Sequence, residues 1–85
     1  MMEEWELISK TDCWVTYRNK NTGHIREHYN YGDIVFYNEK MIFHRLDGPA
    51  EIRRDGSCSW YYNGTKLDCS SQEEFEKLLK LKAFW

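Results

Sequence analysis

The spacing of hydrophobic and polar positions divides this chain into a β-type region and a helical C-terminal region. Across residues 12–67, short runs of β-branched and aromatic residues are separated by turn sequences rich in Asn, Asp and Gly. Runs with this regular spacing are typical of an antiparallel meander. The expected strands lie within residues 13–17, 24–29, 34–37, 41–44, 50–54 and 58–62. The region is therefore predicted to form β-hairpin units over 12–67.

The turn sequences fix where successive strands reverse. Asn63-Gly64 is a strong short hairpin signal, because both residues accept positive φ angles. Asp55-Gly56-Ser57 predicts a second hairpin turn, and Pro49 stands where a strand begins, so its missing N–H does little harm. Residues 1–12 contain an apolar Trp5-x-Leu7-Ile8 patch, which fits a short helix and an edge strand equally well.

Residues 70–83 follow a helical pattern instead. An apolar stripe at helical spacing runs from Phe75 to Leu79, and the stem of Lys82 continues it. Ser70 and Ser71 precede the stripe as N-caps, with glutamates three residues further on as capping-box partners. The predicted fold class is therefore α+β: an antiparallel β-meander of five to six strands with a C-terminal helix packed on one face. The 85 residues are expected to form a single domain, 1–85.

The amino-acid composition indicates an aromatic core and a reducing cellular compartment. Aromatic residues make up 16% of the chain, and large rings let a small core bury more area per residue. The three cysteines are an odd number without a CxxC pair, which indicates a reducing compartment. Cys13 and Cys58 fall in strand-like runs and are expected to be buried, unreactive thiols. With no signal peptide and no long apolar run, the expected location is cytoplasmic, without a membrane partner.

The net charge of −2 conceals an uneven distribution along the chain. Residues 1–12 carry −3 and residues 68–85 carry −1, whereas residues 13–67 carry +2 and all three histidines. The centre is mildly basic and rich in aromatic rings. Binding of a polyanion is therefore compatible with the composition.

The chain contains an internal repeat. Residues 31–39 align with residues 55–64 at an offset of 24 to 25, each copy consisting of a turn, an aromatic strand and a turn with Asn. The second copy and its lead-in, His44-Arg45-Leu46-Asp47-Gly48-Pro49-Ala50, resemble the His-Arg-x-Asp-Gly-Pro-Ala hairpin repeats of small proteins from T-even-like bacteriophages. The resemblance covers about forty residues, from His44 to Leu79, and does not extend to the N-terminal third.

Size and composition are also similar to those of small phage counter-defence proteins that antagonise a toxin–antitoxin ribonuclease. This resemblance implies a protein of the host cell cytoplasm that binds RNA together with a host toxin endoribonuclease and so inhibits the nuclease. The repeat motif itself is informative about architecture rather than activity, because its Asp-Gly-Pro and Asn-Gly elements are turn chemistry. His44 and Arg45 are expected to tie turns together by hydrogen bonds to backbone carbonyls.

Catalytic and metal-binding chemistry find little support in the sequence. His24-x3-His28 and Cys58-x10-Cys69 supply four potential zinc ligands, but positions four apart on a strand are separated by roughly 13 Å. No triad order, phosphate loop or HExxH helix is present. The chain is therefore expected not to be an enzyme and to hold no cofactor and no metal.

Basic and aromatic residues of the strands form the candidate RNA-binding surface. Strand alternation places residues two apart on the same face, so the basic side chains gather on one surface if the polar faces of the strands coincide. Arginine and tyrosine on a sheet are a common way of binding RNA. The candidate residues are Arg18, Lys20, Arg26, His28, Arg53, Arg54, Tyr17 and Tyr29. The competing interpretation is an ordinary solvated polar face.

A third interpretation is a protein-interaction or virion-associated module without nucleic acid. A short meander leaves edge strands unpaired, which allows a homodimer or docking by strand addition. The tryptophans Trp5, Trp14, Trp60 and Trp85 are candidate anchors, although Trp60 is better explained as a core residue.

Overall fold

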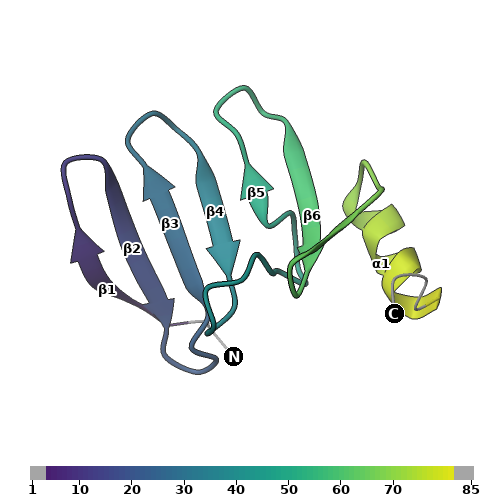
Figure 1. Ribbon diagram of the computed structural model, residues 1–85, viewed down its shortest axis with the longest axis horizontal. Coiled ribbons are helices and arrows are strands. Elements are labelled where there is room, and N and C mark those ends of the chain that lie inside the picture. The colour runs from purple at the N-terminus through teal and green to yellow at the C-terminus, as the bar shows by residue number, and fades with distance from the viewer. Residues whose placement is uncertain (1–3, 82–85) are drawn as a thin grey trace.

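The fold is a single seven-stranded antiparallel sheet followed by one helix, seen in a computed structural model that describes residues 4–81 (Figure 1). The strands lie in the sheet in the same order as in the chain. The elements are β1 (Trp5–Lys10), β2 (Trp14–Asn19), β3 (Ile25–Tyr29), β4 (Ile34–Tyr37), β5 (Glu51–Ile52), β6 (Cys58–Tyr62), β7 (Thr65–Leu67) and α1 (Gln72–Leu81). This confirms the α+β meander and adds one strand to the expected number.

The structure settles one open alternative and departs from the prediction in several segments, among them 50–54, where only Glu51–Ile52 is a strand. The N-terminal segment is the edge strand β1, and Thr65–Leu67 forms β7 after the Asn63-Gly64 turn. The segment 41–44, expected to be a strand, contributes only an isolated bridge between Phe43 and Tyr37. A short polar turn held by the Asn38 side chain bends this segment out of the sheet.

The predicted hairpin turns are confirmed. Asn63 and Gly64 have φ angles of 46° and 88°, the positive pair that a type I′ turn requires. Gly64 also leaves room for Ile42, because a Cβ at position 64 would lie 2.8 Å from the Ile42 methyl carbon. Gly56, with a φ of 91°, lies in the turn between β5 and β6.

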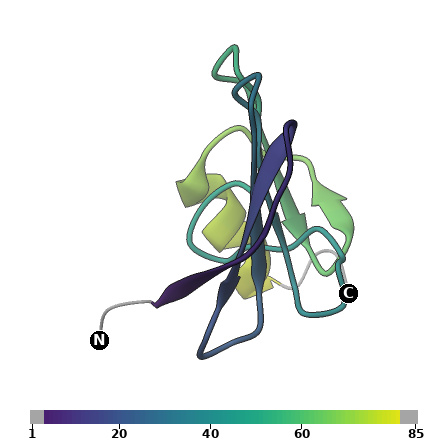
Figure 2. The same cartoon turned by 90° about the vertical axis from the view of Figure 1, so that its left-hand side faces the viewer.

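The strand register divides the sheet into two faces. Trp60 lies on the face that α1 covers, and we call this the helix-side face. The other face, on which Ser59 aligns through Glu51 with Val35, is called the open face. Within residues 4–81, the helix packs against the part of this face formed by Trp60 and Leu67, on β6 and β7. Figure 1 shows it beside this end of the sheet, and Figure 2, viewed from the β1 edge, shows it at the far end.

The core lies where α1 meets the last strands. Trp60, Leu67 and the fully buried Phe75 form a cluster, which confirms the prediction that Trp60 is a core residue. Gln72 joins the helix to its surroundings: its Oε1 accepts from Trp60 Nε1 at 2.8 Å and its Nε2 donates to the Leu46 carbonyl at 2.9 Å. The helix therefore packs on one face, as predicted.

The start of α1 follows the predicted capping pattern. Ser71 Oγ accepts from the Glu74 N–H at 3.2 Å, and Ser70 Oγ donates to Glu74 Oε1 at 2.7 Å. The helix was predicted over 70–83 and is observed over Gln72–Leu81. Lys82, which was predicted to extend the apolar stripe, lies outside the described residues, as does Trp85.

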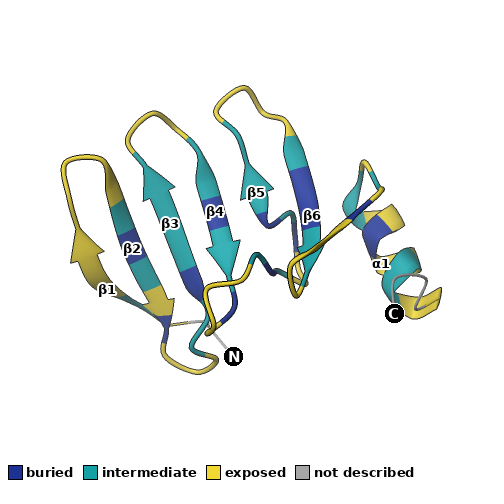
Figure 3. Ribbon diagram, viewed as in Figure 1, coloured by how far each residue is buried: buried dark blue, intermediate teal, exposed yellow. Residues whose placement is uncertain are grey.

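Of the strands, β1 has the longest run of exposed residues, 7–10. Figure 3 shows dark buried segments in the middle strands, whereas the outer half of β1 is exposed. The expectation of a buried Cys13 is wrong, because this residue lies in the β1–β2 turn and is exposed; Cys58 is half-buried. Across the described part of the chain, no helix is long and apolar enough to cross a membrane.

Candidate functional site

The predicted RNA-binding side chains do not share one surface. Arg26 pairs with Tyr17 across β2 and β3, and both lie on the helix-side face. Arg18 pairs with Ile25, the residue before Arg26, so it points to the open face. The expectation that the basic side chains gather on one face is therefore wrong. His28 is on the helix-side face with Arg26, whereas Tyr29 and Arg53 are on the open face with Arg18.

The open-face arginines are neutralised by carboxylates. Arg18 donates from Nε and Nη2 to Glu6 Oε1, at 3.0 and 2.7 Å. Arg53 donates to Glu51 at 3.1 Å and to Ser59 Oγ at 2.6 Å. Both arginines are therefore held within local polar networks.

The remaining two basic candidates lie in turns at opposite ends of the sheet. Lys20 follows β2 and its Nζ is 4.0 Å from a Glu4 carboxylate oxygen. Arg54 is in the β5–β6 turn, where its backbone N–H donates to Asp33 Oδ1 at 2.9 Å. Neither adds to a surface shared with Arg26.

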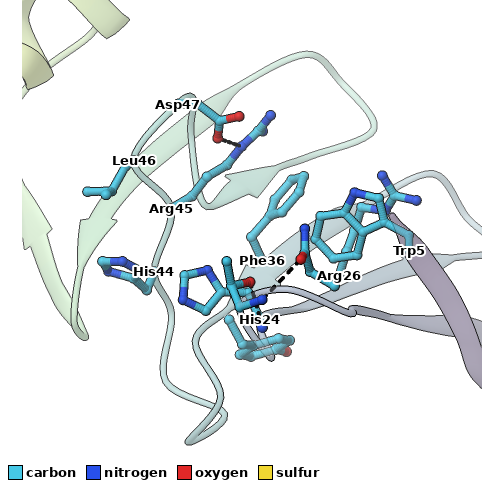
Figure 4. A pocket seen from close by; sticks show the side chains of 11 residues that line it. Trp5, His24, Arg26, Phe36, His44, Arg45, Leu46 and Asp47 are labelled. Carbon is cyan, nitrogen blue, oxygen red and sulfur yellow. Dashed lines mark hydrogen bonds and ion pairs between the residues drawn. The ribbon is translucent and has the colours of Figure 1, made fainter. Parts of the chain in front are cut away.

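A groove on the helix-side face brings basic and aromatic side chains together. Its volume is about 320 Å³, and it lies between the sheet and the β4–β5 connection (Figure 4). The residues that give it its chemistry are Trp5, His24, Arg26, Phe36, His44 and Arg45. They come from β1, β3, β4 and the loops that follow β2 and β4.

Arg26 is the exceptional cation of this groove. Its guanidinium carbon lies 4.5 Å from the Trp5 ring centroid and 4.9 Å from that of Tyr17. Within residues 4–81 it makes no ion pair, and its Nε is buried without a hydrogen-bond partner. A buried N–H of a guanidinium without an acceptor is costly, because water no longer satisfies it. Arg26 is therefore oriented by two rings but not satisfied by them.

Arg45 also stacks on an aromatic ring, that of Phe36, but unlike Arg26 it has hydrogen-bond acceptors for its guanidinium. Its guanidinium carbon is 3.9 Å from the Phe36 ring centroid, while Nε donates to Asp47 at 2.8 Å and Nη1 to the Pro49 carbonyl at 3.2 Å. Gly48 permits this packing, since a Cβ there would lie 2.7 Å from the Arg45 guanidinium carbon. The expected tie to a backbone carbonyl is thus confirmed for Arg45.

His44 ties a turn in a different way from the one expected. Its Nδ1 accepts the Asn63 backbone N–H at 3.0 Å, so it binds an amide donor rather than a carbonyl. Its ring packs edge-on against His24 and Tyr62, with centroids 5.5 and 5.3 Å away. Burial, with the nearby His24, lowers the pKa of His44. The ring is therefore neutral near pH 7 and carries its proton on Nε2.

The second histidine on this face has a similar environment. His28 packs edge-on against Tyr17, with ring centroids 5.7 Å apart, and its Nε2 is buried without a hydrogen-bond partner. Burial, together with the Arg26 charge, lowers the pKa of His28. Near pH 7, His28 and His44 therefore add no positive charge to the helix-side face.

Sequence reasoning missed part of this site. The sequence predicts Trp5 only as an anchor for a protein partner and Phe36 only as part of an aromatic strand. A third, shorter copy of the repeat relates β2 to β4, the strand of Phe36: Thr16-Tyr17-Arg18-Asn19 corresponds to Val35-Phe36-Tyr37-Asn38. In both of these segments the Asn side chain accepts two backbone N–H groups of the following turn. The turn after Asn19 therefore has the same chemistry as the turn after Asn38, in the copy at residues 31–39.

The described residues contain no cluster of three or more His, Cys, Asp or Glu side chains that could hold a metal ion. His24 and His28 have separate neighbours, His44 and Tyr17 respectively. Comparison with known protein families, with curated proteins and with solved structures finds no match to this chain.

Proposed function

We propose that this chain is a non-enzymatic RNA-binding protein that uses the helix-side groove for single-stranded RNA. The observation that carries the proposal is Arg26, a cation held between two aromatic rings without a carboxylate. Its nearest internal counterpart, Arg45, has an acceptor on both Nε and Nη1. A phosphate oxyanion would give Arg26 the acceptors that the protein does not provide.

The surroundings of Arg26 favour nucleic acid over a small anion. The rings of Trp5 and His24 line the groove, and base–aromatic stacking contributes about 1–3 kcal/mol per base. The acidic groove residue Asp47 is already engaged by Arg45, so its charge is compensated. Arg26, Tyr17 and His28 remain the proposed RNA-binding residues of the original set, with Trp5 added.

The resemblance to phage repeat proteins extends the proposal to a partner. On this view the protein acts in phage counter-defence, in the host cytoplasm, and binds a host toxin endoribonuclease together with RNA, which keeps the nuclease inactive. The test is an RNA-cleavage assay with such a toxin, in which added protein should suppress cleavage. Unchanged cleavage at excess protein would remove the nuclease from the proposal while leaving RNA binding to be judged separately.

The RNA-binding proposal is tested by Arg26→Gln, which removes the charge and keeps a long polar side chain. Fluorescence anisotropy with a labelled single-stranded RNA should show about tenfold weaker binding and a salt dependence reduced by about one phosphate contact. The matched control is Arg18→Gln, which removes a cation from the open face and should leave affinity unchanged. Equal losses in both folded variants, or none, would place the RNA elsewhere.

The alternative function is a protein-interaction or virion-associated module. The observation that favours it is the edge strand β1, where Leu7 and Ile8 are 58% and 44% exposed. This interpretation requires association that is insensitive to salt, and material purified at low salt that is free of nucleic acid. Absorbance at 260 and 280 nm together with size-exclusion chromatography distinguishes the two functions and also reports a homodimer.

A further inference from the structure

The open face carries a carboxylate with no cationic partner. Glu27 lies in the middle of β3, paired with Thr16 on β2 and Val35 on β4. Its Oε2 accepts from Thr16 Oγ1 at 3.2 Å and its Oε1 accepts from the Tyr29 hydroxyl at 2.9 Å. Within residues 4–81 it makes no ion pair, so its negative charge is the uncompensated one on this face.

Thr16 and Tyr29 hold this carboxylate in place as donors. The Tyr29 hydroxyl donates to Glu27, and Tyr37 on the neighbouring strand lies close enough for both groups to raise its pKa. Burial raises the pKa of both tyrosines, helped in each case by the neighbouring carboxylate or hydroxyl. The phenols therefore stay protonated, and Glu27 keeps two lone-pair directions free for an incoming donor.

Aromatic rings flank the carboxylate along the sheet. Toward one end, Tyr29 contacts Trp14 and stacks on Tyr31, with ring centroids 6.1 and 5.5 Å apart. Toward the other end, Phe43 lies 5.2 Å from Tyr37 and 4.9 Å from Tyr61. Trp14 and Tyr31 are 37% and 52% exposed, so their rings are accessible to a partner.

We propose that the Glu27 surface, made of Glu27, Tyr29, Tyr31 and Trp14, binds an arginine side chain of a partner protein. A planar guanidinium stacks on exposed rings and donates to a carboxylate at the same time. The charge selects the occupant: the groove on the opposite face offers an unpaired cation, whereas this surface offers an unpaired anion. The inference is independent of RNA binding, because the two surfaces lie on opposite faces of the sheet.

One consequence is a two-sided adaptor. RNA on the helix-side face and a basic protein on the open face would be held by one chain without competing for the same side chains. RNA itself is a poor occupant of the Glu27 surface, since its phosphates would approach an uncompensated carboxylate.

The probe is a synthetic Gly/Ser peptide with three arginines, titrated against the full chain and followed by backbone amide chemical shifts. Saturable shifts should map to the Glu27 surface, and a matched peptide with citrulline, which is uncharged, should leave the spectrum unchanged. Glu27→Gln should weaken peptide binding by about tenfold. Glu73→Gln, which removes an exposed helix carboxylate, is the matched control and should bind normally.

Tyr31→Ser provides a second variant that does not depend on the Glu27 network. Its exposed ring should contribute to peptide binding, while RNA affinity stays as in the unmodified chain. Peptide shifts outside the Glu27 surface, equal binding of the citrulline peptide, or unchanged affinity in both variants would each overturn the inference. Loss of RNA binding in Arg26→Gln with intact peptide binding would leave this inference standing alone.

Discussion

Two arginines with the same chemistry have different roles because their surroundings differ. The contacts of Arg45 account for most residues of the repeat motif. Its guanidinium stacks on Phe36 and donates hydrogen bonds to Asp47 and the Pro49 carbonyl. Gly48 leaves the space that this guanidinium occupies. The motif is therefore mainly structural. Arg26 takes the equivalent position on Tyr17 without those acceptors, and this difference makes it the binding candidate.

Arg45→Lys tests the structural role of the motif. A lysine keeps the charge but cannot stack flat on Phe36 or donate in two directions from a rigid plane. We expect the free energy of unfolding to fall by about 1–3 kcal/mol, measured by urea denaturation. Arg54→Lys in the β5–β6 turn is the matched control and should change stability little. A fully stable Arg45→Lys would mean that Asp47 and Gly48 hold the loop without the guanidinium.

At the scale of elements, α1 depends on a small number of contacts. Phe75 anchors it in the core, Gln72 joins it to Trp60 and Leu46, and Ser71 begins it. Hydrogen bonds from Ser70 lower the pKa of Glu74, so the capping carboxylate stays ionised in mildly acidic solution. A ten-residue helix is marginal alone, which makes these contacts decisive.

Ser71→Ala should loosen the helix before it affects the sheet. Loss of an N-cap costs about 0.5–2 kcal/mol, and hydrogen exchange should accelerate in α1 while β2 to β4 remain protected. Ser9→Ala, an exposed serine in β1, serves as the control and should leave α1 unchanged. Uniform acceleration over all strands would show that helix and sheet open as one unit.

Turn and cap residues made most helices and strands predictable, whereas the pairing of residues between neighbouring strands could not be predicted from them. Asn63-Gly64 and the serine caps act within a few residues of the chain, so their outcomes were readable in advance. The face occupied by Arg18 or Arg26 depends on which residues pair across β2 and β3, and a shift of one residue would reverse it. The groove was missed for the same reason, because Trp5 reaches Arg26 only through the pairing of β1 with β2.

At the scale of the molecule, the sheet separates charges between its faces. The open face combines two compensated ion pairs with the unpaired Glu27, and the helix-side face combines Arg26 with two neutral histidines. Because both histidines are partly buried in one face, the stability of the whole fold depends on their protonation.

Acidification should weaken the fold in a defined window. His28 and His44 have pKa values below their ordinary 6.5, mainly because of burial, so protons are bound more readily after unfolding. Stability is therefore complete above about pH 7 and decreases as the pH falls through 6.5 toward the lowered values. Urea midpoints from about pH 7.5 to about pH 5.5 measure this, with His44→Gln as the comparison variant. A flat wild-type profile would contradict the assignment of neutral, buried rings.

The chain order of β1 to β7 in the sheet also has a kinetic consequence. Apart from β4 and β5, which residues 38–50 connect, each strand finds its partner across a short connection, so little loop-closure entropy is lost before pairing is rewarded. Folding should therefore be fast for a β protein, and each hairpin contacts mainly its two neighbours, as in a linear array. In such an array a further hairpin lengthens the sheet without requiring a new core, which is a simple route by which proteins of this architecture gain or lose repeats.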